Sequence, residues 1–91
     1  MNERIRVIIY RSNRSIESQA IVGNGVKFGK KYMIKKESGN PVSQCESFGE
    51  NFGMELIKNK INNIRFDRNG FKYHGRVKAF ANGMRKAKVG F

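Results

Sequence analysis

Hydrophobic and polar residues alternate along the first third of the chain, as expected for β-strands. Ile5, Val7 and Ile9, for example, fall on one face of the first segment. Side chains of a strand point alternately to its two faces, so this pattern predicts three strands. The strands are residues 5–10, 15–22 and 26–36, and polar turns at 11–14 and 23–25 connect them. We expect the third strand to be bulged at Gly29.

Helical spacing begins after residue 40. Asn40 followed by Pro41 is a helix-start signal, because Asn accepts a hydrogen bond from a free N–H group and Pro suits the first helical position. The predicted helix, residues 41–60, carries one apolar stripe at three- and four-residue steps. Its members are Val42, Cys45, Phe48, Gly49, Phe52, Leu56 and Ile57. We expect Gly49 and Gly53 to allow a close approach to the sheet.

A second strand and helix complete the pattern. Residues 64–66 predict a short strand and residues 67–75 a connector, and a helix follows from residue 76. Its inward face is Val77, Phe80, Ala81 and Met84. The order β-β-β-α-β-α predicts one α+β domain over residues 1–91, a mixed sheet of about four strands with two helices on one face. A right-handed crossover is expected if the third and fourth strands are parallel. Residues 89–91 fit either a short edge strand or a loose end.

The charge of the chain and its distribution indicate what kind of partner the protein binds. The 91 residues carry a formal net charge of +12. Residues 1–36 hold nine basic and two acidic side chains, and residues 64–91 hold eight and one, whereas residues 37–63 have a net charge of −2. A nucleic acid is the simplest partner that neutralises such an excess. We therefore expect the middle segment, residues 37–63, which carries four of the seven acids, to face away from this polyanion.

Several classes of protein and site do not fit the residue inventory. Cys45 is the only cysteine, so an internal disulfide and a Cys-rich zinc site are excluded. The apolar run at residues 7–10 is too short for a signal peptide core or a membrane span. Asp67 and His74 are the candidates for an RNA-modifying enzyme, but no nucleophile with a base and an orienting group is evident. We expect no catalytic residue, metal or cofactor.

Cations and aromatic rings are interleaved in the predicted connector and at the start of the second helix. Arginine offers bidentate forks to phosphate, lysine a point charge, and aromatic rings a platform for unstacked bases. The candidate RNA-binding residues here are Arg68, Phe71, Lys72, Tyr73, His74 and Arg76. Gly75 leaves the helix start open to a phosphate. We expect Phe71 and Tyr73 to lie on different sides of the connector, at least one of them in the core. For His74 we expect contact with RNA first, a structural role packed in the turn second, and a role as general base last.

A second group of cations lies along the predicted third strand. The lysine cluster consists of Lys27, Lys30, Lys31, Lys35 and Lys36. It fits either phosphate contact or a solvated edge strand on which lysines prevent pairing with other chains. The basic flanks of the chain favour phosphate contact, and on this hypothesis Lys27, Lys30, Lys31 and Lys35 bind RNA.

A long motif carries a resemblance to a known family. Residues 66–79, F-D-R-N-G-F-K-Y-H-G-R-V-K-A, closely resemble the signature F-D-R-G-G-Y-x-Y-H-G-R-V-K-A of bacterial-type large-subunit ribosomal protein eighteen. Residues 11–13, R-S-N, resemble the F-R-S-N hairpin of that family, and Phe48-Gly49 falls at the spacing of its V-G. The second helix and Phe91 fall where the family ends, so the resemblance covers nearly the whole chain.

The resemblance implies a function as well as a fold. The expected partner is 5S rRNA in the central protuberance, with neighbouring large-subunit rRNA and ribosomal proteins beside it and no membrane. The location is a ribosome of a bacterial cytoplasm or an organelle, either mitochondrial matrix or plastid stroma. Contacts carried over by position are Arg11, Asn13, Arg14, Arg68, Tyr73, His74, Arg76 and Lys78. An RNA-modifying enzyme and a non-specific RNA chaperone are the alternatives.

Two departures from the family pattern stand out. Asn69 replaces the first Gly of the signature pair, so Asn must adopt a left-handed backbone there. The chain also enters its first predicted strand almost at once. We therefore expect the arginine-rich N-terminal extension of the family to be absent. Our hypothesis is that the lysine cluster compensates for it.

Overall fold

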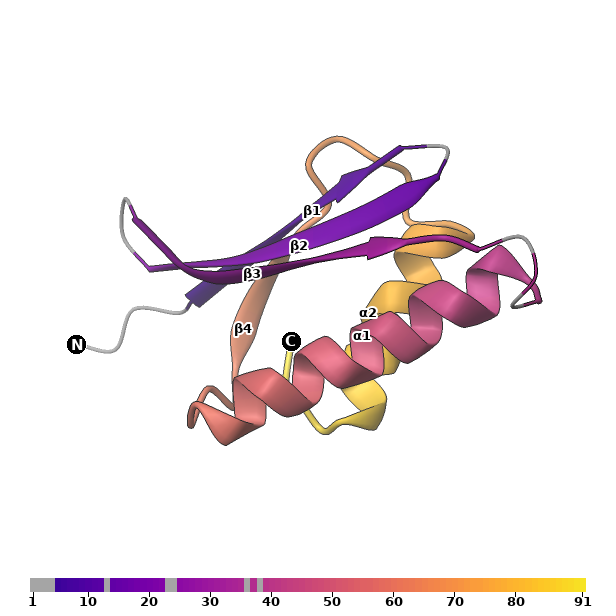
Figure 1. The fold of residues 1–91 in the computed structure, drawn as a ribbon. Coiled ribbons are helices and arrows are strands. Elements are labelled where there is room, and N and C mark those ends of the chain that lie inside the picture. Colours follow the sequence, from indigo (N-terminus) through magenta and orange to yellow (C-terminus); the bar gives the residue numbers. More distant parts are fainter. Residues whose placement is uncertain (1–4, 13, 23–24, 36, 38) are drawn as a thin grey trace.

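The architecture is one four-stranded sheet with two helices on a single face (Figure 1). The computed structural model describes residues 5–12, 14–22, 25–35, 37 and 39–91. Its elements are β1 (Ile5–Arg11), β2 (Ser15–Val22), β3 (Gly25–Met33), α1 (Pro41–Lys58), β4 (Ile64–Asp67) and α2 (Arg76–Lys86). This order and the mixed sheet confirm the predicted α+β fold.

The segment through α1 carries the chain from one edge of the sheet to the other. β1 pairs with β2, and β2 with β3, in antiparallel register. β4 pairs in parallel with β1, which gives the strand order β3-β2-β1-β4. β3 and β4 therefore run in the same direction at opposite edges. Because β4 runs alongside β1, both strands end where the β1–β2 hairpin turns (Figure 1).

The hydrophobic core lies between the sheet and the helices. Val7 and Ile9 of β1 are fully buried, and so is Phe80 of α2. The Phe80 ring contacts the rings of Phe48 and Phe52 of α1, with centroids 5.6 and 5.9 Å apart. The predicted inward face of α2 is entirely buried. On α1 the stripe is also confirmed except at its ends: Val42 is exposed and Ile57 is half-buried.

The glycines of α1 serve contact with α2, and not with the sheet. A Cβ atom added at Gly49 would overlap the backbone of Phe80, and one added at Gly53 would meet Met84 and Ala87. Gly83 of α2 makes the reciprocal approach to the α1 backbone. The predicted close approach is therefore present, but the sheet as its partner was wrong. An aromatic layer separates α1 from the sheet, whereas the two helix backbones touch.

Helix α1 begins where its cap predicts. The Asn40 side chain accepts a hydrogen bond from the Val42 N–H group at 2.8 Å, and Pro41 is the first helical residue. The helix ends at Lys58, two residues before the predicted end. In the part of the chain that the structure describes, neither helix is long and apolar enough to cross a membrane.

The bulge in the outer pair of strands lies at Lys27. The register changes from Ala20 opposite Phe28 to Ile21 opposite Val26, so Lys27 is the extra residue. Gly29 stays paired with Gln19, and the predicted bulge at Gly29 is wrong. A Cβ atom at Gly29 would lie 3.1 Å from the Ser18 carbonyl oxygen, so this glycine permits a close approach of two strands.

The C-terminal residues form a short edge pairing, which decides between the two predicted alternatives. Gly90 bridges Asn63 in parallel. The Ile64 N–H group donates to the Gly90 carbonyl oxygen at 2.9 Å. Phe91 packs its ring against Phe66, with centroids 5.6 Å apart. The end of the chain therefore extends the sheet edge at the start of β4.

Candidate nucleic-acid interface

The β1–β2 hairpin meets the β4–α2 connector, residues 68–75, at one end of the sheet (Figure 1). Arg76 Nη1 donates to the Ser12 carbonyl oxygen at 3.3 Å, although the two residues are 64 positions apart. The Arg11 guanidinium lies 5.8 Å from the centroid of the Phe71 ring. Tertiary structure thus joins the two segments that carry most of the predicted RNA contacts. Asn13, also predicted, lies outside the described residues.

A tight turn opens the connector. Asn69 and Gly70 have φ angles of 52° and 80°, the positive values that a type I′ turn requires at both central positions. The Phe71 N–H group closes the turn by donating to the Arg68 carbonyl oxygen at 2.9 Å. The expected left-handed Asn69 is confirmed. Arg68, at the first position of the turn, is exposed.

The two aromatic side chains of the connector have different partners. Phe71 lies beside Arg11 of the hairpin, whereas the Tyr73 hydroxyl accepts a hydrogen bond from Arg85 Nη1 of α2 at 2.9 Å. Both rings are half-buried and pack against the edge of the core, so the expectation that one of them lies in the core was wrong. Lys72, between the two aromatic residues in the sequence, and His74, directly after Tyr73, are exposed. The connector is therefore anchored through its rings and presents its cations.

The start of α2 lies in the same region. Gly75, with φ 58°, precedes the helix, and in the described part of the chain no side-chain hydrogen bond caps its first turn. The predicted open start is confirmed, and uncapped N–H groups of a first turn attract anions. Arg76 is half-buried and Lys78 is exposed.

The lysine cluster is divided along β3. Lys35 lies at the hairpin end, because the neighbouring Ile34 N–H group donates to the Arg14 carbonyl oxygen at 2.7 Å. Lys27 lies at the other end of the strand, beside the pair of Val22 and Gly25. Lys30 and Lys31 lie between them and line a groove of about 540 Å³ against α1, with Phe48, Phe52 and Met54 in the lining. Lys36 is outside the described residues.

A buried amide holds Lys35 in place. Gln44 of α1 accepts hydrogen bonds from the Lys35 N–H group and from the Tyr32 hydroxyl, both at 2.9 Å. Its amide nitrogen donates to the carbonyl oxygens of Lys35 and Gly39 at 2.7 and 3.0 Å. The segment after β3 is thereby fixed to the first turns of α1, close to the hairpin.

The acids of α1 lie in the helical layer. Glu46 forms an ion pair with Lys86 of α2, and this hydrogen bond and the carboxylate charge raise the pKa of Lys86. Glu50 and Glu55 are half-buried. The first of these acids therefore joins the two helices, a role that the sequence pattern did not indicate.

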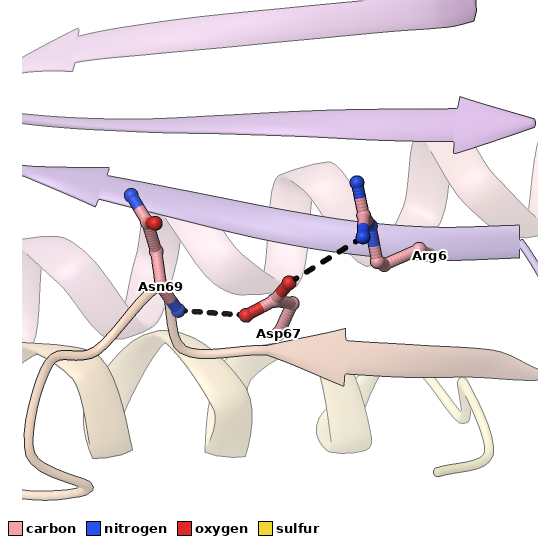
Figure 2. A network of polar contacts seen from close by, with 3 residues as sticks. All are labelled: Arg6, Asp67 and Asn69. Carbon is pink, nitrogen blue, oxygen red and sulfur yellow. Dashed lines mark hydrogen bonds and ion pairs between the residues drawn. The ribbon is translucent and has the colours of Figure 1, made fainter. Parts of the chain in front are cut away.

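Two basic residues that the sequence analysis did not select lie beside the connector. Arg6 of β1 and Arg65 of β4 are partners in the parallel register. Arg6 Nη1 lies 3.8 Å from Asp67 Oδ2, and Asp67 Oδ1 accepts a hydrogen bond from the Asn69 N–H group at 2.8 Å. Figure 2 shows Asp67 between these two partners. The candidate catalytic acid is thus engaged in holding the turn and Arg6. Polar alternation places each arginine on a solvent face, but only the β1–β4 pairing brings them together.

Comparison with known proteins reveals one family. The profile of ribosomal L18 of archaea, bacteria, mitochondria and chloroplast matches residues 1–91. Large ribosomal subunit protein uL18 of Chlorobium luteolum is 37% identical over 94 aligned positions, which cover 98% of this chain and 79% of that protein. The proteins of the same name from Treponema pallidum and Mycoplasma mobile are 36% and 38% identical, over 97% and 94% of this chain and 77% and 75% of their own lengths.

Proposed function

This chain belongs to the ribosomal L18 family, and from this membership we propose that it binds 5S rRNA and helps to anchor it in the central protuberance. Its relatives in Chlorobium, Treponema and Mycoplasma are named as proteins of the large ribosomal subunit. The role we assign is structural and not catalytic. The partners we expect are 5S rRNA, the adjacent large-subunit rRNA and neighbouring ribosomal proteins.

The observation that carries this proposal is the junction between hairpin and connector. The Arg76 bond to Ser12 and the contact of Arg11 with Phe71 join two basic segments from distant parts of the chain. Rigid attachment matters, because a preformed surface loses less conformational entropy when it binds RNA than two separate loops would. The interface then combines phosphate-binding cations with ring edges and an uncapped helix start.

Within this interface we assign roles by exposure. Exposed cations such as Arg14, Arg68 and Lys72 are free to contact phosphates, which supply most of the affinity of such proteins for RNA. Phe71 and Tyr73 are half-buried and hold the connector in shape. His74 is exposed beside them and is the ring best placed to stack on or donate to an unpaired base.

Binding to 5S rRNA and to an unrelated RNA of equal length, at one salt concentration, tests the proposal. We expect a clear preference for 5S rRNA, and loss of that preference in the double variant Arg11→Gln with Arg76→Gln. Lys60→Gln, at an exposed turn position two residues after the end of α1, is the control for loss of a positive charge. Equal affinity of the wild-type protein for both RNAs would indicate a non-specific chaperone. RNA turnover that disappears in His74→Ala would indicate an enzyme.

A further inference from the structure

Two arginines face each other across β1 and β4. Arg6 and Arg65 are register partners, and neighbouring strands lie about 4.8 Å apart. Their neighbours Val7 and Ile64 are buried in the core, so both arginines project from the face that the helices do not cover. Like charges directly opposite each other destabilise a sheet. A bound anion between them would remove that cost.

A third arginine completes a polar pocket at this place. Arg68, in the turn after β4, lines a pocket of about 390 Å³ together with Arg6 and Arg65. Asp67 is the acid of the pocket, and its carboxylate already accepts the Asn69 N–H hydrogen bond while it lies 3.8 Å from Arg6. Figure 2 shows that Asp67 faces Arg6 across the strand pair. One carboxylate against three guanidinium groups leaves the pocket with an excess of positive charge.

We propose that Arg6, Arg65 and Arg68 bind a phosphate of the RNA backbone. This inference rests on the proposed function, because it takes RNA as the source of the phosphate. Guanidinium forks match phosphate oxygens bidentately, and three of them at one pocket suit a phosphate better than a base. Asp67 holds the turn through the Asn69 N–H group, and its carboxylate competes with phosphate for Arg6. The pocket extends the interface from the hairpin end along the β4 edge.

The salt dependence of RNA binding tests the pocket directly. Each phosphate contact that is lost reduces the slope of log affinity against log salt by about 0.9 for a duplex and about 0.7 for a single strand. We expect Arg65→Gln to bind 5S rRNA more weakly and with a slope lower by about one contact. Lys60→Gln, which removes an equal charge from a residue that does not line the pocket, should leave the slope unchanged. Equal slopes in the two variants would overturn the proposal.

Asp67→Asn provides a test with the opposite sign. The amide oxygen still accepts the Asn69 hydrogen bond, so the turn is retained, but the competing negative charge is gone. If the pocket binds phosphate, this variant binds RNA more tightly than the wild-type protein at low salt. Weaker binding with an unchanged thermal unfolding midpoint would contradict the proposal.

The two proposals fail in different ways. A wild-type protein that does not prefer 5S rRNA contradicts the proposed function, whereas a reduced slope in Arg65→Gln on either RNA still supports the pocket. Inorganic phosphate separates the sources of the anion. Shifts of the Arg65 Nε–Hε NMR signal on addition of RNA support the proposal. Shifts with inorganic phosphate but none with RNA would overturn RNA as the ligand.

Discussion

Gly49 of α1 and Phe80 of α2 touch through their backbones. A Cβ atom at Gly49 would overlap the Phe80 carbonyl oxygen, and one at Gly83 would overlap the Glu46 carbonyl oxygen. The two helices therefore pack closely at reciprocal glycines, while the Phe80 side chain points into the ring cluster with Phe48 and Phe52. Arg76, which bonds to the hairpin, is the first residue of the same helix α2.

Gly49→Ala is expected to destabilise the protein. Alanine favours a helix over glycine by about 1 kcal/mol, but the overlap is with backbone atoms that no side-chain rotation can relieve. Overpacking of this kind costs typically about 1–3 kcal/mol, and we expect a net loss near the upper end of this range. Urea unfolding followed by circular dichroism measures it. Gly25→Ala, where an added Cβ meets nothing within 4 Å, is the control, and equal stability of the two variants would contradict the prediction.

Gln44→Leu should weaken the attachment of the segment after β3. The substitution removes the partners of the Tyr32 hydroxyl, the Lys35 backbone and the Gly39 carbonyl oxygen. A buried polar group left unsatisfied costs about 1–3 kcal/mol, so we expect a loss of at least that size in the free energy of unfolding. Amide hydrogen exchange at Lys35 should become faster. The neighbouring exposed Ser43→Ala should change neither quantity, and unchanged exchange in Gln44→Leu would refute the assigned role.

Cys45 makes stability depend on alkaline pH. Burial raises the pKa of its thiol, and the positive charges of Arg76 and Arg11 offset part of this rise. The folded protein therefore holds the thiol proton to higher pH than the unfolded chain does. This contribution to stability is complete below the unfolded thiol pKa and is lost as pH rises above about 8.5. In Cys45→Ala the free energy of unfolding should fall less steeply over that range, and equal pH dependence would disprove the assignment.

The two ends of β3 should differ in their contribution to RNA binding. Lys35 lies beside the hairpin and its backbone is held by Gln44, whereas Lys27 lies at the far end of the strand. We expect Lys35→Gln to reduce the salt slope of 5S rRNA binding by about one phosphate contact. Lys27→Gln, at the other end of β3, is the matched variant, and charge reversal of Lys30, Lys31 and Lys35 together should weaken binding further. If Lys27→Gln flattens the slope as much as Lys35→Gln, the whole strand binds RNA as one surface.

Local patterns were sufficient for most of the secondary structure. Strand alternation, the Asn40–Pro41 start and the inward face of α2 reappear in the structure because each depends only on near neighbours in the chain. The bulge was misplaced because it depends on the register between β2 and β3. The partner of Gly49 was missed for a similar reason, since a glycine in a helix shows that something approaches but not what approaches.

The sequence by itself determined the order of elements, the basic character of both flanks and the signature that marks the family. Only the tertiary structure decided which of these segments meet. Because β4 pairs in parallel with β1, the hairpin and the connector share one end of the sheet, and Arg6 lies beside Arg65. Such contacts depend on the free energy of packing between segments that are distant in the chain. No pattern of local spacing encodes which strand pairs with which, and the arginine pocket follows from that pairing.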